Sequence, residues 1–242
     1  MRSGNPALGE KAFRSAGERS AEPMTLGGTV NKTFMLLALT IAASVWTWNL
    51  YFHSEASVVP WLAVGAIGGF IAALITIFAK KAAPVTAPLY ALLEGLFLGG
   101  ISAMFASAYS GIVIQAVSLT FAILFALLFL YKTRIIRATE NFKLGVAAAT
   151  FGIMLVYLFQ FVLGFFGMQI PYLHSSGIVG IGISVFIVIV ASLNLVLDFD
   201  FIENGVRYGA PKYMEWYGAF GLMVTLVWLY LETLRLIAKL RD

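Results

Sequence analysis

The sequence is dominated by seven apolar stretches that are each long enough to cross a lipid bilayer. A spanning helix needs about 20 mostly apolar residues, and polar, Pro or Gly residues separate the seven stretches. Charged residues make up 12% of the 242 residues, against roughly 25% in a soluble domain. The pattern therefore predicts an all-α integral membrane protein with seven transmembrane helices. The predicted spans are approximately Thr33–Phe52, Val58–Ala79, Pro88–Ala108, Ile112–Tyr131, Leu144–Phe166, Gly177–Leu197 and Tyr217–Ala238.

The basic residues predict the orientation. With the N-terminus in the cytoplasm, thirteen Lys and Arg fall in the cytoplasmic tail and loops, and none falls in the three opposite loops. Residues 1–30 have no sustained apolar period and are expected to form a flexible cytoplasmic tail, followed by a transmembrane domain over residues 31–242. Three basic residues near the C-terminus would lie on the outer side. Six spans with a re-entrant last segment would remove that conflict, and we favour seven.

Composition excludes several classes of function. The chain has no cysteine, so it has no disulfide and no thiol nucleophile. Its net charge of +4 lies mostly in short loops, which indicates membrane topology and not nucleic-acid binding. It also lacks Gly-x-Ser-Gly and Gly-x-Gly-Asp motifs, and both histidines lie in predicted loops. We therefore expect no enzymatic activity and no resident cofactor.

Small residues at helical spacing predict close helix packing. Gly65 and Gly69 lie four residues apart in the second span, and Gly95 and Gly99 repeat this spacing in the third. Such pairs allow two helix backbones to approach closely in a membrane. They indicate a helical bundle without indicating its function.

Acidic residues within the spans are the candidates for function, because a charge at the bilayer centre costs about 2.5–3.5 kcal/mol on insertion scales. Glu94 lies within the third span among apolar neighbours. Asp198 ends the sixth span, and it shares one helical face with the small or polar residues Asn194, Ala191 and Ser184. This stripe is expected to face other helices. A neutral acid that only bonds a neighbouring helix is the structural alternative for Glu94.

Three other acids have simpler interpretations. Asp200 points away from Asp198 on a helix and is expected to be an interfacial charge. Glu232 lies three residues before Arg235, a spacing that predicts a local ion pair. Glu215 precedes the seventh span, where it would favour a helix N-terminus.

The predicted spans contain no basic residue before the seventh, so Glu94 and Asp198 have no evident countercharge. Two carboxyl groups held together in a low dielectric can share a proton or bind a metal cation. Clusters of carboxylate oxygens suit hard cations such as calcium. Asp198 is therefore expected to be a metal ligand that binds a calcium ion transiently.

The stretches that carry these acids resemble the Bax inhibitor-1 family, also called the transmembrane Bax inhibitor motif proteins. The resemblance covers roughly residues 25 to 240, and its last part is similar to a bacterial branch. It rests on the following stretches: Leu93-Glu94-Gly95-Leu96, Leu98-Gly99-Gly100-Ile101-Ser102, Leu195-Val196-Leu197-Asp198, the continuation to Glu203, Gly209 to Tyr217, and Leu234-Arg235-Leu236-Ile237.

The resemblance implies six helices around a central seventh, and a pH-sensitive calcium leak gated by two aspartates on the sixth and seventh helices. Asp198 matches the first aspartate. The position expected for the second, counted back from Arg235, falls at or near Thr225. Either Glu94, Asp200 or Glu215 supplies the partner, or this branch lacks the paired sensor.

We therefore expect a passive cation leak in which Asp198, Glu94, Asp200, Glu215 and Thr225 are candidate sensing residues, and Asn194 and Ser184 line the bundle. The expected partners are the lipid bilayer and calcium or protons, in a monomer of the bacterial inner membrane. The alternative is a regulatory or scaffold protein that binds other membrane proteins without transport.

Overall fold

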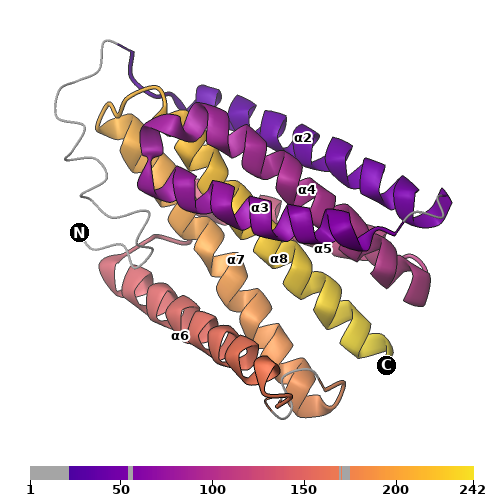
Figure 1. Ribbon diagram of the computed structural model, residues 1–242. Helices are drawn as coiled ribbons and strands as arrows, with labels where there is room; N and C mark the ends of the chain where they lie inside the picture. Colours follow the sequence, from indigo (N-terminus) through magenta and orange to yellow (C-terminus); the bar gives the residue numbers. More distant parts are fainter. Residues whose placement is uncertain (1–21, 54–56, 169, 171–174) are drawn as a thin grey trace. The chain divides into compact units, whose positions relative to one another are not determined.

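The computed structural model describes residues 22–53, 57–168, 170 and 175–242, and within them the chain forms seven long helices (Figure 1). All seven are long and apolar enough to cross a membrane, which confirms the predicted fold class. A short 3-10 helix, η1 (Lys80–Ala82), precedes the third of them. The long helices are α2 (Leu26–His53), α3 (Val59–Phe78), α4 (Ala83–Ala108), α5 (Ile112–Lys132), α6 (Glu140–Phe165), α7 (Ile178–Arg207) and α8 (Met214–Arg241).

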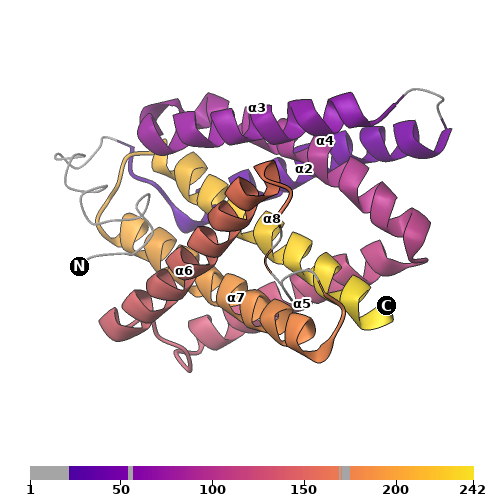
Figure 2. The ribbon, with the colours of Figure 1, turned by 60° about the horizontal axis from the view of Figure 1, so that its bottom comes forward.

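The described residues divide into two compact units. One comprises Ile112–Phe199 and Thr225–Asp242, and we call it the α5–α6 unit. The other comprises residues 22–111 and Asp200–Val224, and we call it the α2–α4 unit. The ranges of α7 and α8, which Figure 2 shows from a second direction, contribute residues to both units.

Several helices extend beyond their predicted bounds, and α2 and α7 do so by the most residues. α2 begins at Leu26 rather than Thr33, because the hydroxyl of Thr25 accepts a hydrogen bond from the Gly28 N–H and caps the helix. Residues 26–30 of the predicted tail are therefore helical, whereas residues 1–21 lie outside the described part. α7 continues past the predicted end at Leu197 to Arg207. It stops where Gly209 adopts a positive φ of 65°.

In the α2–α4 unit, α4 packs closely against both α2 and α3, as its glycines predict. A Cβ atom on Gly99 would lie 2.1 Å from Thr47 Oγ1 and 2.2 Å from the Ser44 carbonyl oxygen, so only glycine fits. Gly95 and Gly65 are similarly enclosed. The contact between α2 and α4 also carries two hydrogen bonds from hydroxyl groups to backbone carbonyls. Thr40 donates to the Ala91 carbonyl oxygen at 3.1 Å, and Ser44 donates to that of Gly95 at 2.9 Å.

In the α5–α6 unit, the C-terminal part of α8 bonds each of the other helices. Arg241 donates to Gln115 of α5 at 2.7 Å, and Lys239 donates to Ser184 of α7 at 2.9 Å. Tyr157 of α6 donates to Glu232 at 2.8 Å. The C-terminal half of α8 is thereby connected to α5, α6 and α7 through polar side chains.

The outer surface of α6 is apolar, as a lipid-facing helix requires. Only 11% of its most apolar window is buried within the protein, compared with 56% for α8. An exposed apolar face of this size would be unstable in water and suits the hydrocarbon layer of a membrane. Its exposed large side chains include Phe151, Met154, Leu155, Leu158, Phe159, Phe161 and Phe165.

Candidate functional site

Asp198 is a buried acid with one unused oxygen. It lies inside α7, not at its end, and the side chain is only 3% exposed. The hydroxyl of Thr225 on α8 donates a hydrogen bond to its carboxylate. Its other oxygen, Oδ2, is buried and has no hydrogen-bond partner among the described residues. An isolated carboxylate oxygen in such surroundings is costly, so a ligand or a proton at Oδ2 would be strongly stabilised.

Thr225 thus occupies the place that the sequence resemblance gave to a second acid. It is 7% exposed and belongs, with Asp198, to the α5–α6 unit. In place of two facing carboxyl groups, the structure has the Asp198 carboxylate facing the Thr225 hydroxyl. This pair connects α7 to α8 at one level of the bundle.

The predicted stripe on α7 does face protein. Ser184 and Asn194 are 2% and 9% exposed, and Ala191 between them is fully buried. The Asn194 side-chain amide donates to the Thr150 hydroxyl of α6 at 2.8 Å. The stripe therefore connects α7 to α6 at Asn194 and to α8 at Asp198 and Ser184.

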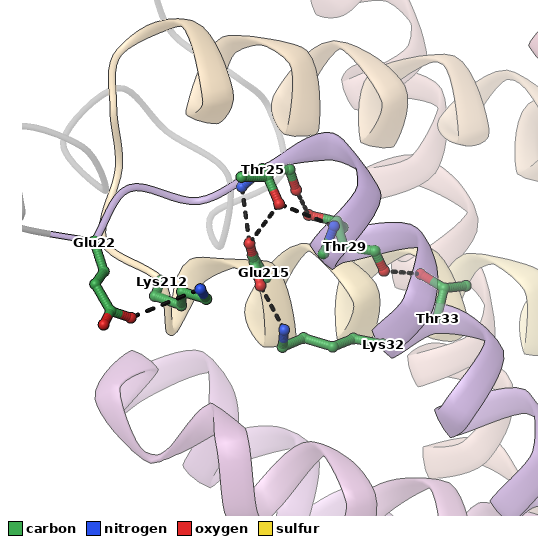
Figure 3. A network of polar contacts seen from close by, with 8 residues as sticks. Glu22, Thr25, Thr29, Lys32, Thr33, Lys212 and Glu215 are labelled. Atoms are coloured by element: carbon green, nitrogen blue, oxygen red, sulfur yellow. Dashed lines mark hydrogen bonds and ion pairs between the residues drawn. The ribbon is translucent and has the colours of Figure 1, made fainter.

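Glu215, one of the candidate partners of Asp198, is already engaged elsewhere. Its side chain is fully buried and accepts hydrogen bonds from the backbone N–H of Thr25 at 2.8 Å and from the Thr25 hydroxyl at 2.9 Å. Lys32 forms an ion pair with its other oxygen, as Figure 3 shows. The Cβ of an alanine at position 28 would lie 2.2 Å from the carboxylate, so Gly28 is needed at this contact. We call Thr25, Gly28, Lys32 and Glu215 the N-terminal clamp.

The backbone strengthens the N-terminal clamp. The Met24 N–H donates to the Ala210 carbonyl oxygen at 2.7 Å, and the Lys212 N–H donates to that of Glu22 at 3.1 Å. The side chains of Glu22 and Lys212 form an exposed ion pair at 3.6 Å. The start of α2 is thereby fixed to the loop before α8, within the α2–α4 unit.

The other two candidate partners also lie in the α2–α4 unit. Glu94 is half-buried on α4, and its carboxylate lies against Gly69 of α3, 3.0 Å from the position of an added Cβ. Asp200 accepts a hydrogen bond from Asn204, one turn later on α7, at 2.8 Å. Because Asp198 belongs to the other unit, its proximity to Glu94 stays a prediction.

The predicted ion pair on α8 is present and includes a residue that the sequence did not single out. Arg235 and Glu232 are 2.9 Å apart, and both bond the Tyr157 hydroxyl at 2.8 Å. Glu232 is 2% exposed, and its Oε2 has no hydrogen-bond partner among the described residues. Tyr157 is a tyrosine in mid-span, where a hydroxyl needs a partner, and this is the signal that could have identified it.

No group of three or more His, Asp and Glu side chains able to hold a metal ion occurs in the part of the chain that the structure describes. Among these residues a cation at Asp198 would therefore meet fewer than three such side chains, which suits brief occupancy and not stable storage. Asp198 as a calcium ligand stays a prediction.

The comparisons with known proteins agree with the helical architecture. The chain matches the family described as Bax inhibitor 1 like over residues 5–242, which is nearly its whole length. No curated protein and no solved structure matches it at a significant level.

Proposed function

The chain belongs to the Bax inhibitor 1-like family of membrane proteins, and from this premise we propose that it is a passive cation leak, carrying calcium, that opens when Asp198 is protonated. The observation that carries the proposal is the buried Asp198 carboxylate, whose Oδ2 has no hydrogen-bond partner among the described residues. In its charged form this group attracts a cation into the bundle.

Protonation would change the contact between α7 and α8. The charged carboxylate accepts the Thr225 hydrogen bond, and a hydrogen bond to an ionised acceptor is roughly twice as strong as a neutral one. A proton on the carboxyl group removes this advantage and weakens the connection of the two helices. A local change of charge is thus converted into a change of helix packing.

Thr225 explains how such a switch works with a single acid. A hydroxyl group donates to a carboxylate without needing a shared proton, so the charged form of Asp198 is held by Thr225 where a second acid would repel it. The proposed sensor is therefore the Asp198–Thr225 pair, without Glu94, Asp200 or Glu215 as an obligatory partner.

Flux measurements test the proposal directly. Purified protein in lipid vesicles that contain a calcium indicator is expected to leak calcium several-fold faster at acidic than at neutral pH. Asp198→Asn, which is neutral at every pH, is expected to lose this dependence, with a ratio of acidic to neutral flux of about one. Glu140→Gln is a matched control, because this carboxylate lies in the same unit but is exposed.

The proposal is wrong if wild type and Asp198→Asn leak no more than empty vesicles at every pH. A scaffold protein would give that result, and it would still retain its membrane-protein partners in detergent after Asp198 and Glu94 were neutralised. A leak whose pH dependence survives Asp198→Asn would assign the sensing to another group.

A further inference from the structure

Lys239 is a buried cation in the last turn of α8. It is only 6% exposed. Its ammonium group donates to the Gly180 carbonyl oxygen at 3.1 Å and to the Ser184 hydroxyl at 2.9 Å. Lysine is rarely buried, because removing an ammonium ion from water is costly, so this placement requires an explanation.

Stabilisation of the helix C-terminus does not explain the burial. A cation in the last turn interacts favourably with the helix dipole from an exposed position. Arg241 has such a position, since it is exposed and bonds Gln115. The charge of Lys239 is directed instead into the contact between α7 and α8, which we call the α7–α8 seam.

Polar or small residues occur along the seam at heptad spacing. Thr225, Glu232 and Lys239 are seven residues apart on α8, and Asp198, Ala191 and Ser184 are seven apart on the antiparallel α7. Residues at this spacing share one helix face. The structure joins Asp198 to Thr225 at one end of the seam and Ser184 to Lys239 at the other. Fourteen residues of helix separate these ends by about 21 Å.

The two ends of the seam have opposite charges. The Asp198 end carries a carboxylate with an unbonded oxygen, whereas the Lys239 end carries an ammonium group whose bonds include those to the Gly180 carbonyl oxygen and the Ser184 hydroxyl. A mobile cation that loses its hydration shell is coordinated by oxygens of the same kinds, from carbonyl and hydroxyl groups. Between the ends, Glu232 is held by Arg235 and Tyr157.

We propose that the Lys239 ammonium group is a tethered cation that occupies the oxygen ligands at this end of the α7–α8 seam and closes it to mobile cations. This inference rests on the proposed leak and names the residue that limits it. A cation attracted by Asp198 meets a fixed positive charge in the place that it would otherwise fill. Flux then requires displacement of Lys239.

Substitutions that separate charge from size test this role in the vesicle assay. Lys239→Met keeps an unbranched side chain without the charge, and it is expected to leak calcium several-fold faster than wild type at neutral pH. Lys239→Arg keeps the charge and should remain close to wild type. Arg241→Gln removes a charge from the same helix turn outside the seam, and it should leave the flux unchanged. Equal or slower flux in a folded Lys239→Met protein, checked by gel filtration and thermal melting, would overturn the proposal.

A second measurement does not depend on flux. The chain has no cysteine, so a single Ser184→Cys reports access to the seam through its reaction with a small, water-soluble, positively charged thiol reagent. The reaction is expected to be several-fold faster when Lys239→Met is also present. Ser110→Cys, in an exposed turn, should react equally fast in both backgrounds.

The two measurements fail in different ways. Equal labelling of Ser184→Cys with and without Lys239→Met would overturn closure by Lys239, whatever the flux. Faster labelling without any calcium flux, in wild type or variant, would retain Lys239 as the closing group and would reject the calcium leak.

Discussion

Glu215→Ala is expected to lower the free energy of unfolding by about 3–5 kcal/mol, because it removes one partner of a buried ion pair. The Glu215 side chain is fully buried, and the Lys32 side chain opposite it is 18% exposed. The substitution would also leave the backbone N–H of Thr25 without its acceptor. Thermal or denaturant unfolding of the purified protein in detergent measures the loss.

The chain supplies a matched control for this prediction. Glu22 and Lys212 form an ion pair in the same region, but their side chains are 76% and 55% exposed. Exposed pairs contribute about 0–1 kcal/mol, so Lys212→Ala should have little effect. A double variant, Glu215→Leu with Lys32→Met, replaces both charges by apolar groups and should recover part of the loss. If Glu215→Ala unfolds as Lys212→Ala does, the N-terminal clamp is not a stabilising contact.

Gly99→Ala is expected to destabilise the protein by about 3 kcal/mol, at the upper end of the range for overpacking. The added Cβ would lie 2.1 Å from Thr47 Oγ1 and 2.2 Å from the Ser44 carbonyl oxygen. One of these atoms belongs to the backbone of α2, so a side-chain rotation cannot remove the clash. α2 and α4 must separate, and their two hydroxyl–carbonyl hydrogen bonds would be strained.

Gly152→Ala is the control for this substitution. Gly152 lies on the exposed face of α6, and a Cβ there meets no atom within 4 Å. Alanine has a higher helix propensity than glycine by about 1 kcal/mol, so this variant should be neutral or slightly more stable. The two glycine-to-alanine changes are thus expected to have opposite signs, measured by the same unfolding experiment. Equal melting temperatures would show that α2 and α4 tolerate a wider separation.

The sequence was sufficient for features that depend on spacing along one helix. Apolar length predicted the seven spans, and the three-residue spacing of Glu232 and Arg235 predicted their ion pair. The spacing of Ser184 and Asp198 placed both on a face that the structure buries. Periodicity determines the face of a residue because the helix geometry is fixed.

Contacts that depend on which helices pack together could not be predicted from spacing along one helix. Thr25 and Glu215 are 190 positions apart, and nothing in their local sequence connects them. The hydroxyl of Tyr157 bonds Glu232 across 75 positions. Hydropathy also placed the end of α7 too early, because the helix continues through Asp198 and Asp200 after the apolar stretch ends.

Hydroxyl groups in the bundle are of two kinds, according to where their hydrogen-bond acceptor lies. Thr40 and Ser44 of α2 donate to backbone carbonyls of another helix, α4. Thr33, Thr120 and Ser192 donate instead to the carbonyl one turn earlier in their own helix. A residue of that second kind carries its acceptor with it, so valine or alanine can replace it without leaving a neighbouring helix unsatisfied. Over evolutionary time such positions are free to drift between polar and apolar residues. Thr40 and Ser44 do not have this freedom, because their hydrogen bonds determine which surface of α4 packs against α2.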